Sequence, residues 1–174
     1  MAELVLVHIV GPDATGLIAA VAGRLYDLGV NLGDTSFAVL GEAAKLTAVC
    51  ELPEGMSADG LEGELRSLPP LAAATLSISP FAYRPARGDQ ARITHHIEIT
   101  GDDVPGLVAQ LAEVLGEFGA NIVTLNSERV PSPGGVRYVS RLAVWLPEDK
   151  AEACLASIAN TAEQLSLSCW SKAI

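Results

Sequence analysis

The sequence predicts an α+β protein made of two copies of one βαββαβ unit, with antiparallel sheets and with the helices on one face of each sheet. The main observation is an internal repeat: residues 9–36 and 99–126 align without a gap at an offset of 90, and ten of the 28 aligned positions are identical. Within each copy, short apolar runs alternate with stretches whose apolar residues recur at helical spacing. Glycine and proline separate these stretches, as they do at turns.

Each copy is predicted to begin with a strand, a loop and a helix. The strands are predicted at residues 4–10 and 94–100. One apolar stripe defines each helix, and it consists of Leu17, Ile18, Val21, Leu25 and Leu28 in the first copy and of Leu107, Val108, Leu111, Leu115 and Phe118 in the second. Gly29 and Gly119 follow at the position where a residue in the left-handed conformation ends a helix.

The remainder of each copy is predicted as two strands, a helix and a final strand. These elements are predicted at 30–40, 45–51, 57–68 and 74–79 in the first copy, and at 120–130, 136–146, 148–162 and 166–171 in the second. The two domains would then be residues 1–80 and 92–174. Residues 81–91 combine proline and glycine with polar residues and are predicted to be an extended linker, long enough for the copies to lie side by side.

The composition restricts the classes of partner and compartment. The chain has 174 residues with 11 Lys and Arg against 21 Asp and Glu, a formal charge of −10. So acidic a surface repels phosphate groups, and we therefore expect no direct binding to nucleic acid or to membranes. The chain lacks both an apolar run near the ~20 residues of a membrane span and the basic start of a signal peptide. Its three cysteines form no CxxC pair, which favours a reduced, cytoplasmic protein.

The loop before the first helix of each copy carries the pattern G-x-D-x-x-G-L. Asp13 and Asp103 fall where an N-cap carboxylate accepts backbone N–H groups, and Pro105 suits an opening turn. Gly16 and Gly106 fall in the predicted first turn, where glycine lowers helix stability by ~1 kcal/mol. Because both copies accept this penalty at the same place, we predict that a neighbouring backbone or a small ligand approaches these glycines closely.

This pattern, followed by L-x-x-x-G-x-N-[IL] inside a βαββαβ unit, resembles the ACT domain, a ferredoxin-like module that senses small molecules in amino-acid metabolism. A chain of two such modules resembles the glycine cleavage system transcriptional repressor family. The resemblance implies an effector, usually an amino acid, that binds between paired modules. The loop of one module and the start of the second strand of the other would make the contacts.

The geometry of the repeat favours the same arrangement. In a right-handed crossover the first and second strands are parallel, so Asp13 and Asn31 lie at opposite ends of one sheet. If the copies pair across the antiparallel edges of their second strands, Asp13 comes near Asn121 and Asp103 near Asn31. The predicted ligand-binding residues are Asp13, Thr15, Gly16, Leu17, Asn31, Leu32, Asp103, Pro105, Gly106, Leu107, Asn121 and Ile122.

Each candidate has an alternative, purely structural interpretation. The aspartates could serve only as helix caps, the asparagines could close the turn after the helix, and the glycines could serve only the backbone conformation. His95 and His96 are adjacent in a strand and point to opposite faces, so they do not chelate one metal. Cys50, Cys154 and Cys169 are predicted to be small buried side chains. The chain has neither GxSxG nor GxxxxGK[ST], and we expect no enzyme activity, metal or cofactor.

The sequence therefore predicts a homo-oligomeric regulatory protein that senses an amino acid or a similar small effector. It would regulate transcription in glycine and one-carbon metabolism through a protein partner, such as a DNA-binding regulator. Two alternatives remain open. The chain could be an assembly module that binds no ligand, or a detached regulatory subunit of an amino-acid or folate metabolic enzyme.

Overall fold

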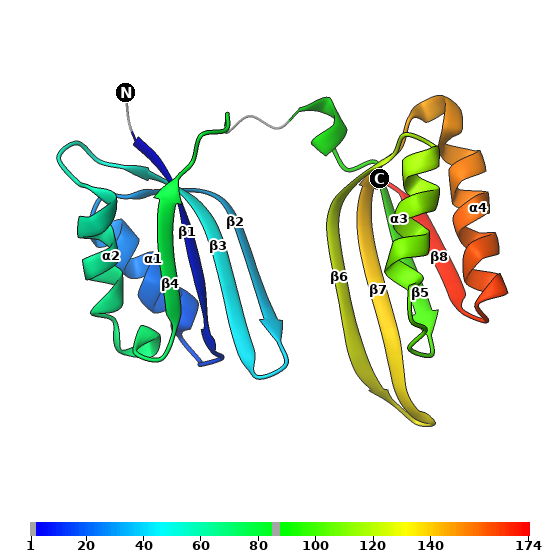
Figure 1. The fold of residues 1–174 in the computed structure, drawn as a ribbon, viewed down its shortest axis with the longest axis horizontal. Helices are drawn as coiled ribbons and strands as arrows, with labels where there is room; N and C mark the ends of the chain where they lie inside the picture. Colours follow the sequence, from blue (N-terminus) through cyan, green and yellow to red (C-terminus); the bar gives the residue numbers. More distant parts are fainter. Residues whose placement is uncertain (1–2, 85–87) are drawn as a thin grey trace. The chain divides into compact units, whose positions relative to one another are not determined.

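The computed structural model describes residues 3–84 and 88–174, and the chain divides into two compact units, residues 1–85 and 86–174. Each unit has a four-stranded antiparallel sheet with its helices on one face (Figure 1). The order of elements in both is βαββαβ, which confirms the predicted fold class. No helix within these described ranges is both long and apolar enough to cross a membrane.

The first unit consists of β1 (Glu3–Pro12), α1 (Leu17–Asp27), β2 (Asn31–Leu40), β3 (Ala43–Leu52), α2 (Ala58–Arg66) and β4 (Thr75–Pro80), with a 3₁₀ turn at Pro69–Leu71. Its strand order is β2-β3-β1-β4. Because β1 and β2 both pair antiparallel to β3, they run parallel to each other, as the crossover rule predicts.

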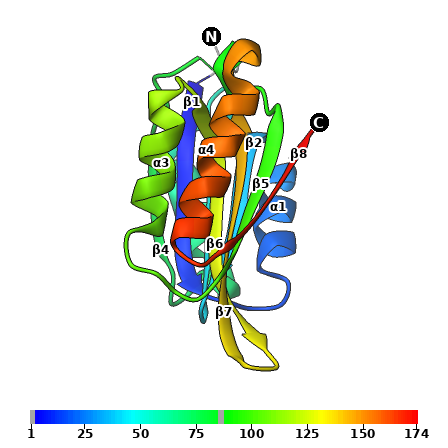
Figure 2. The same ribbon diagram turned by 90° about the vertical axis from the view of Figure 1, so that its right-hand side faces the viewer.

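The second unit consists of β5 (His95–Gly101), α3 (Leu107–Glu117), β6 (Asn121–Ser132), β7 (Gly135–Trp145), α4 (Ala151–Gln164) and β8 (Ser168–Ala173), with 3₁₀ turns at Asp89–Ala91 and Glu148–Lys150. Its strand order is β6-β7-β5-β8. Figure 2 shows α3 and α4 side by side on one face of this sheet.

The predicted linker is not extended throughout. Residues 89–91 form a 3₁₀ turn, and the Asn121 side chain donates a hydrogen bond of 2.8 Å to the Gln90 carbonyl. This end of the segment therefore belongs to the second unit. Residues 85–87, in the middle of the predicted linker, lie outside the described residues.

Each unit has its own apolar core between sheet and helices. In the first unit alternate residues of β1 (Val5, Val7 and Ile9) are fully buried beneath Leu61 and Leu65 of α2. The α1 stripe contributes Leu17, Val21 and Leu25, whereas Ile18, at the edge of the stripe, is 39% exposed. The second core has the same plan and is built from Ile97, Ile99, Leu107, Leu111, Leu115, Leu142, Val144, Cys154 and Ile158, among others.

The helix C-termini agree with the prediction. Gly29 and Gly119 both have φ of +70°. The N–H of the following residue reaches back to the Leu25 carbonyl in α1 and to the Leu115 carbonyl in α3, each at 2.9 Å. This is the Schellman arrangement, in which a left-handed residue lets the chain turn sharply from helix to strand.

Candidate functional site

The loop between β1 and α1 is the centre of the candidate site in the first unit. The backbone N–H of Asp13 donates to the Glu42 carbonyl at 2.9 Å, which fixes the start of the loop against the β2–β3 turn. The Asp13 side chain is exposed, and no side chain in residues 3–84 or 88–174 forms a hydrogen bond or ion pair with its carboxylate. The loop thus presents a negative charge next to a helix N-terminus.

The predicted N-cap role of the two aspartates is wrong. Helix α1 begins at Leu17 and α3 at Leu107, so the capping positions are Gly16 and Gly106, and neither helix has a side-chain cap. Pro105 correspondingly precedes the cap instead of opening the helix. The consequence is that the N–H groups of Ile18 and Ala19 have no acceptor among the described residues, and the same holds for Val108 and Ala109.

The four repeat glycines of these loops have two different explanations. Gly16 and Gly106 have φ of +87° and +85°, and a Cβ atom at Gly16 would meet nothing within 4 Å. They are therefore needed for a left-handed backbone, and no neighbouring backbone approaches either glycine closely. Close approach by a small ligand stays a prediction. Close approach occurs instead at Gly11, where a Cβ would lie 2.6 Å from the Cβ of Ala74, and at Gly101, where it would overlap Leu167.

Each loop borders a surface cavity. The cavity of the first unit has a volume of about 480 Å³ and is lined by Asp13, Ala14, Gly16, Leu17, Ile18, Ala19 and Phe37. The cavity of the second unit has about 190 Å³ and is lined by residues 103–109 and Tyr138. Asp13, Gly16, Leu17, Asp103, Pro105, Gly106 and Leu107 were all predicted as ligand-binding residues, whereas Thr15 lies in the turn outside the cavity wall.

An arginine outside the repeated loop motif changes the second loop. The Arg129 guanidinium, from β6, donates two hydrogen bonds to one carboxylate oxygen of Asp103, at 2.5 and 3.2 Å. The Asp103 carboxylate accordingly raises the pKa of Arg129 above its usual value. Val39 occupies the corresponding position of the repeat, so Asp13 has no such partner. Extending the alignment at offset 90 beyond residue 126 would have shown this difference.

The predicted asparagines lie at the far end of each sheet from the aspartates. Pro12, next to Asp13, pairs with Ala43, whereas Asn31 pairs with Glu51 at the other end of β3. The Asn31 side chain donates to the Glu51 carboxylate at 3.3 Å, and that of Asn121 donates to the Gln90 carbonyl. Neither side chain closes the turn after its helix.

Leu32 and Ile122, which follow the two asparagines, do not line the loop cavities. The predicted pairing of Asp13 with Asn121, and of Asp103 with Asn31, stays a prediction.

The histidines and cysteines form no metal site in the described parts of the chain. His95 hydrogen bonds through Nδ1 to the Thr94 hydroxyl at 3.0 Å, and no group of three or more His, Cys, Asp and Glu residues there could hold a metal ion. Cys50 and Cys154 are fully buried, as predicted, and Cys169 is half-buried against the second core. Burial raises the pKa of all three thiols, which reduces their reactivity.

Comparison with known proteins supports this description. Residues 3–78, within the first unit, match the family model of the ACT domain. Among solved structures, an "unknown protein" from Galdieria sulphuraria is 19% identical, with 100% of this chain and 99% of that chain covered and a TM-score of 0.76. A "putative glycine cleavage system transcriptional repressor" is 13% identical, with coverage of 100% and 98% and a TM-score of 0.63.

At these identities the structural likeness extends to the fold, and the chain has a two-domain, ACT-like architecture. The resemblance predicted from the repeated loop pattern is therefore confirmed. No curated protein matches the sequence of this chain.

Proposed function

We propose that this protein, with its two-domain ACT-like fold, is a regulatory sensor that binds an α-amino acid at the β1–α1 loop of its first unit. The observation that carries the proposal is the pairing of two complementary groups at one cavity. The Asp13 carboxylate has no partner among the described side chains, and the N–H groups of Ile18 and Ala19 have no acceptor there. Together they match the ammonium and carboxylate of an α-amino acid.

The electrostatics of the loop favour both contacts. The N-terminus of α1 carries the positive end of the helix dipole, and free N–H groups at such a position bind carboxylates. A carboxylate within hydrogen-bonding distance of an ammonium forms a charge-assisted contact that is stronger than a neutral hydrogen bond. The second loop is different, because Arg129 already neutralises Asp103. We therefore place the sensing site in the first unit.

A regulatory role suits the chain better than a catalytic one. Among the described residues, the groups with clearly raised pKa values are three cysteines, whose thiols burial keeps protonated, and two exposed arginines in ion pairs. None of these is a nucleophile or base activated in a cleft. Ligand binding would act by stabilising one of two states of the protein. The shift in free energy between the states cannot exceed the difference in the ligand's binding free energy for them.

The partner in this proposal is a protein. A formal charge of −10 opposes direct binding to DNA. The fold shared with a protein described as a glycine cleavage system transcriptional repressor supports a role in transcription control. We propose a cytoplasmic, homo-oligomeric regulator of glycine and one-carbon metabolism that contacts a DNA-binding protein.

Thermal unfolding in the presence of each of the twenty amino acids tests the sensing site. A ligand at 100 times its Kd should add about 2.7 kcal/mol to the free energy of unfolding. Asp13→Asn keeps the shape of the side chain and removes its charge, and it should weaken binding about tenfold or more. Asp27→Asn, at the other end of α1, is the charge-matched control. The proposal would be contradicted if none of the twenty amino acids raised the melting temperature, or if Asp13→Asn left binding unchanged.

Assembly without a ligand is the second candidate function, and the surface of β2 favours it. This edge strand exposes apolar side chains: Phe37 is 42%, Val39 50% and Leu40 59% exposed. Exposed apolar edge strands pair readily with other chains. Val39→Lys should then reduce the mass measured by sedimentation, whereas Val136→Lys, at a similarly exposed position in β7, should not. An unchanged mass in both variants would eliminate this candidate.

A further inference from the structure

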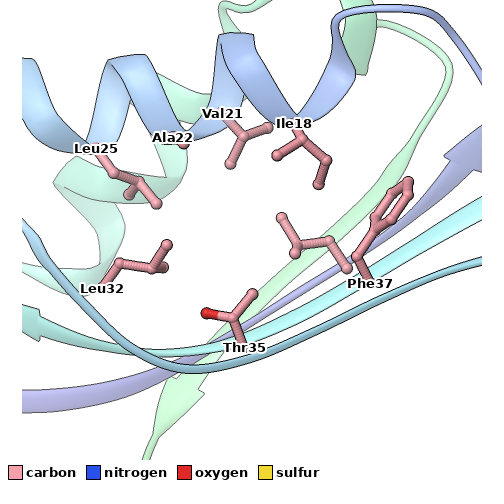
Figure 3. Close-up of a pocket in the computed structure, with 8 residues that line it drawn as sticks. Ile18, Val21, Ala22, Leu25, Leu32, Thr35 and Phe37 are labelled. Atoms are coloured by element: carbon pink, nitrogen blue, oxygen red, sulfur yellow. The ribbon is translucent and has the colours of Figure 1, made fainter.

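A second cavity of the first unit lies between α1 and β2, beside the loop just described (Figure 3). It has a volume of about 190 Å³. Helix α1 contributes Ile18, Ala22 and Leu25, and β2 contributes Leu32 and Phe37. Figure 3 shows side chains of the helix and of the strand directed toward the same space.

The cavity exists because the edge strand carries apolar side chains that α1 does not cover. A bulge between Leu32 and Thr35 shifts the register of β2 against β3. Leu32 and Phe37 then lie opposite Cys50 and Leu46, on the helix-facing side of the sheet, yet they are 41% and 42% exposed.

The side chains that line this cavity are apolar apart from one. Its one polar side chain is Thr35, whose hydroxyl donates to the Gly33 carbonyl at 3.0 Å and so needs no ligand. An apolar protein cavity of about 150 Å³ is large enough to take up benzene. A volume of about 190 Å³ therefore suits a branched aliphatic group or one aromatic ring.

The apolar cavity and the loop cavity are neighbours. Ile18 and Phe37 line both of them, one from the first turn of α1 and the other from β2. A molecule whose charged end lies at Asp13 and the α1 N-terminus could therefore place an apolar group beyond these two side chains.

Two apolar positions of this surface are polar in the second unit. At offset 90, Phe37 corresponds to Ser127, and its cross-strand partner Leu46 corresponds in register to Ser140. The hydroxyls of the two serines hydrogen bond to each other at 2.8 Å. The two units thus differ in the charge of the loop before the first helix and in the polarity of the sheet beside it.

We infer that the first unit selects amino acids with a branched aliphatic or aromatic side chain, which enters the cavity between α1 and β2. The charged groups of the same molecule bind at the β1–α1 loop, so this inference rests on the proposed function. Glycine and serine have no group to fill the cavity and should bind more weakly.

Isothermal titration of the full chain with leucine and phenylalanine, and with glycine and serine, tests the selection. Leucine should bind about 100-fold more tightly than glycine, because its side chain buries roughly three to four additional carbon atoms. Ala22→Leu fills the cavity from α1 and should remove most of this preference. Ala112→Leu, the same change at the equivalent position of α3, should leave it intact.

A second variant tests the inference independently, in case Ala22→Leu disturbs folding. Phe37→Ser introduces the residue of the second unit at a half-exposed site, and it should lower leucine affinity about tenfold while leaving the weak binding of glycine unchanged. The melting temperature of each variant shows whether it is folded.

The outcomes separate the two proposals. A preference for leucine over glycine that is lost in Ala22→Leu and kept in Ala112→Leu supports the inference. If glycine or serine binds as tightly as leucine, or if Ala22→Leu changes nothing, the selection is overturned while the sensing site stands. If no amino acid binds, the proposed function fails and the inference fails with it.

Discussion

Gly11 belongs to the loop motif, but its role is in packing: it leaves room for Ala74. It lies at the end of β1, and a Cβ there would come within 2.6 Å of the Cβ and 3.0 Å of the Cα of Ala74, next to β4. The backbone of Ala74 would have to move, and interior packing leaves little room for such a shift. In Gly101 the clash is mainly with the end of the flexible Leu167 side chain, which can rotate away.

Gly11→Ala should therefore lower the free energy of unfolding by about 1–3 kcal/mol, the usual cost of overpacking. Gly23→Ala is the matched control, because a Cβ at this α1 position meets nothing within 4 Å. It should raise stability by up to about 1 kcal/mol, since alanine favours helix. Urea unfolding measures both, and equal effects of the two changes would show that packing at Ala74 is unimportant.

Cys50 should make stability sensitive to alkaline pH. Burial raises the pKa of this thiol from 9.0 to about 11. Above pH 9 the unfolded chain loses the proton while the folded chain keeps it, so stability falls as pH rises from 9 to about 11. The slope is about 1.4 kcal/mol per pH unit.

The measurement compares unfolding of the wild type and of Cys50→Ala between pH 8 and 11. The difference in their free energies of unfolding should shrink as pH rises, because only the wild type loses the contribution of this thiol. Cys169→Ala, at a half-buried site, should show a smaller change. Parallel pH profiles of the wild type and Cys50→Ala would contradict the argument.

At the scale of the elements, helix ends were harder to predict than helix stripes. The C-terminal glycines agree with expectation because the Schellman arrangement depends on local sequence. The starts differ: the predicted caps Asp13 and Asp103 precede the actual caps, Gly16 and Gly106. The loop between strand and helix needs a left-handed residue, and that requirement takes precedence over side-chain capping.

The N-terminus of helix α2, in contrast, is capped by a side chain, that of Ser57. The Ser57 hydroxyl accepts a hydrogen bond of 3.1 Å from the Gly60 N–H. Ser57→Ala should lower the free energy of unfolding by about 1 kcal/mol, whereas Ser57→Asp keeps an acceptor and should cost far less. Thermal unfolding of both variants is the check, and an equal loss in the two would mean that capping is not the cause.

At the scale of the whole molecule, residues 3–84 and 88–174 form two cores that share no residue. Leu61 in α2 and Ile158 in α4 are at most 1% exposed, and each contributes to one core only. We therefore expect a change in one core to leave the other core protected.

Leu61→Ala and Ile158→Ala should each cost about 2–5 kcal/mol, through lost apolar contact and the cavity left behind. Hydrogen exchange should then accelerate in β1, β3 and β4 for the first variant, and in β5, β7 and β8 for the second. Acceleration throughout the chain in either variant would show that the two units unfold as one.

The sequence by itself determined the duplication, the order of elements, the apolar stripes of the helices and the glycines that end α1 and α3. These features depend on periodicity and on residues close together in the chain. Only the tertiary structure decided that Arg129 reaches Asp103, that Ala74 blocks a side chain at Gly11 and that Phe37 faces Ile18 across a cavity. These contacts depend on strand register and on the bulge in β2, which join residues far apart in sequence and have no local signature.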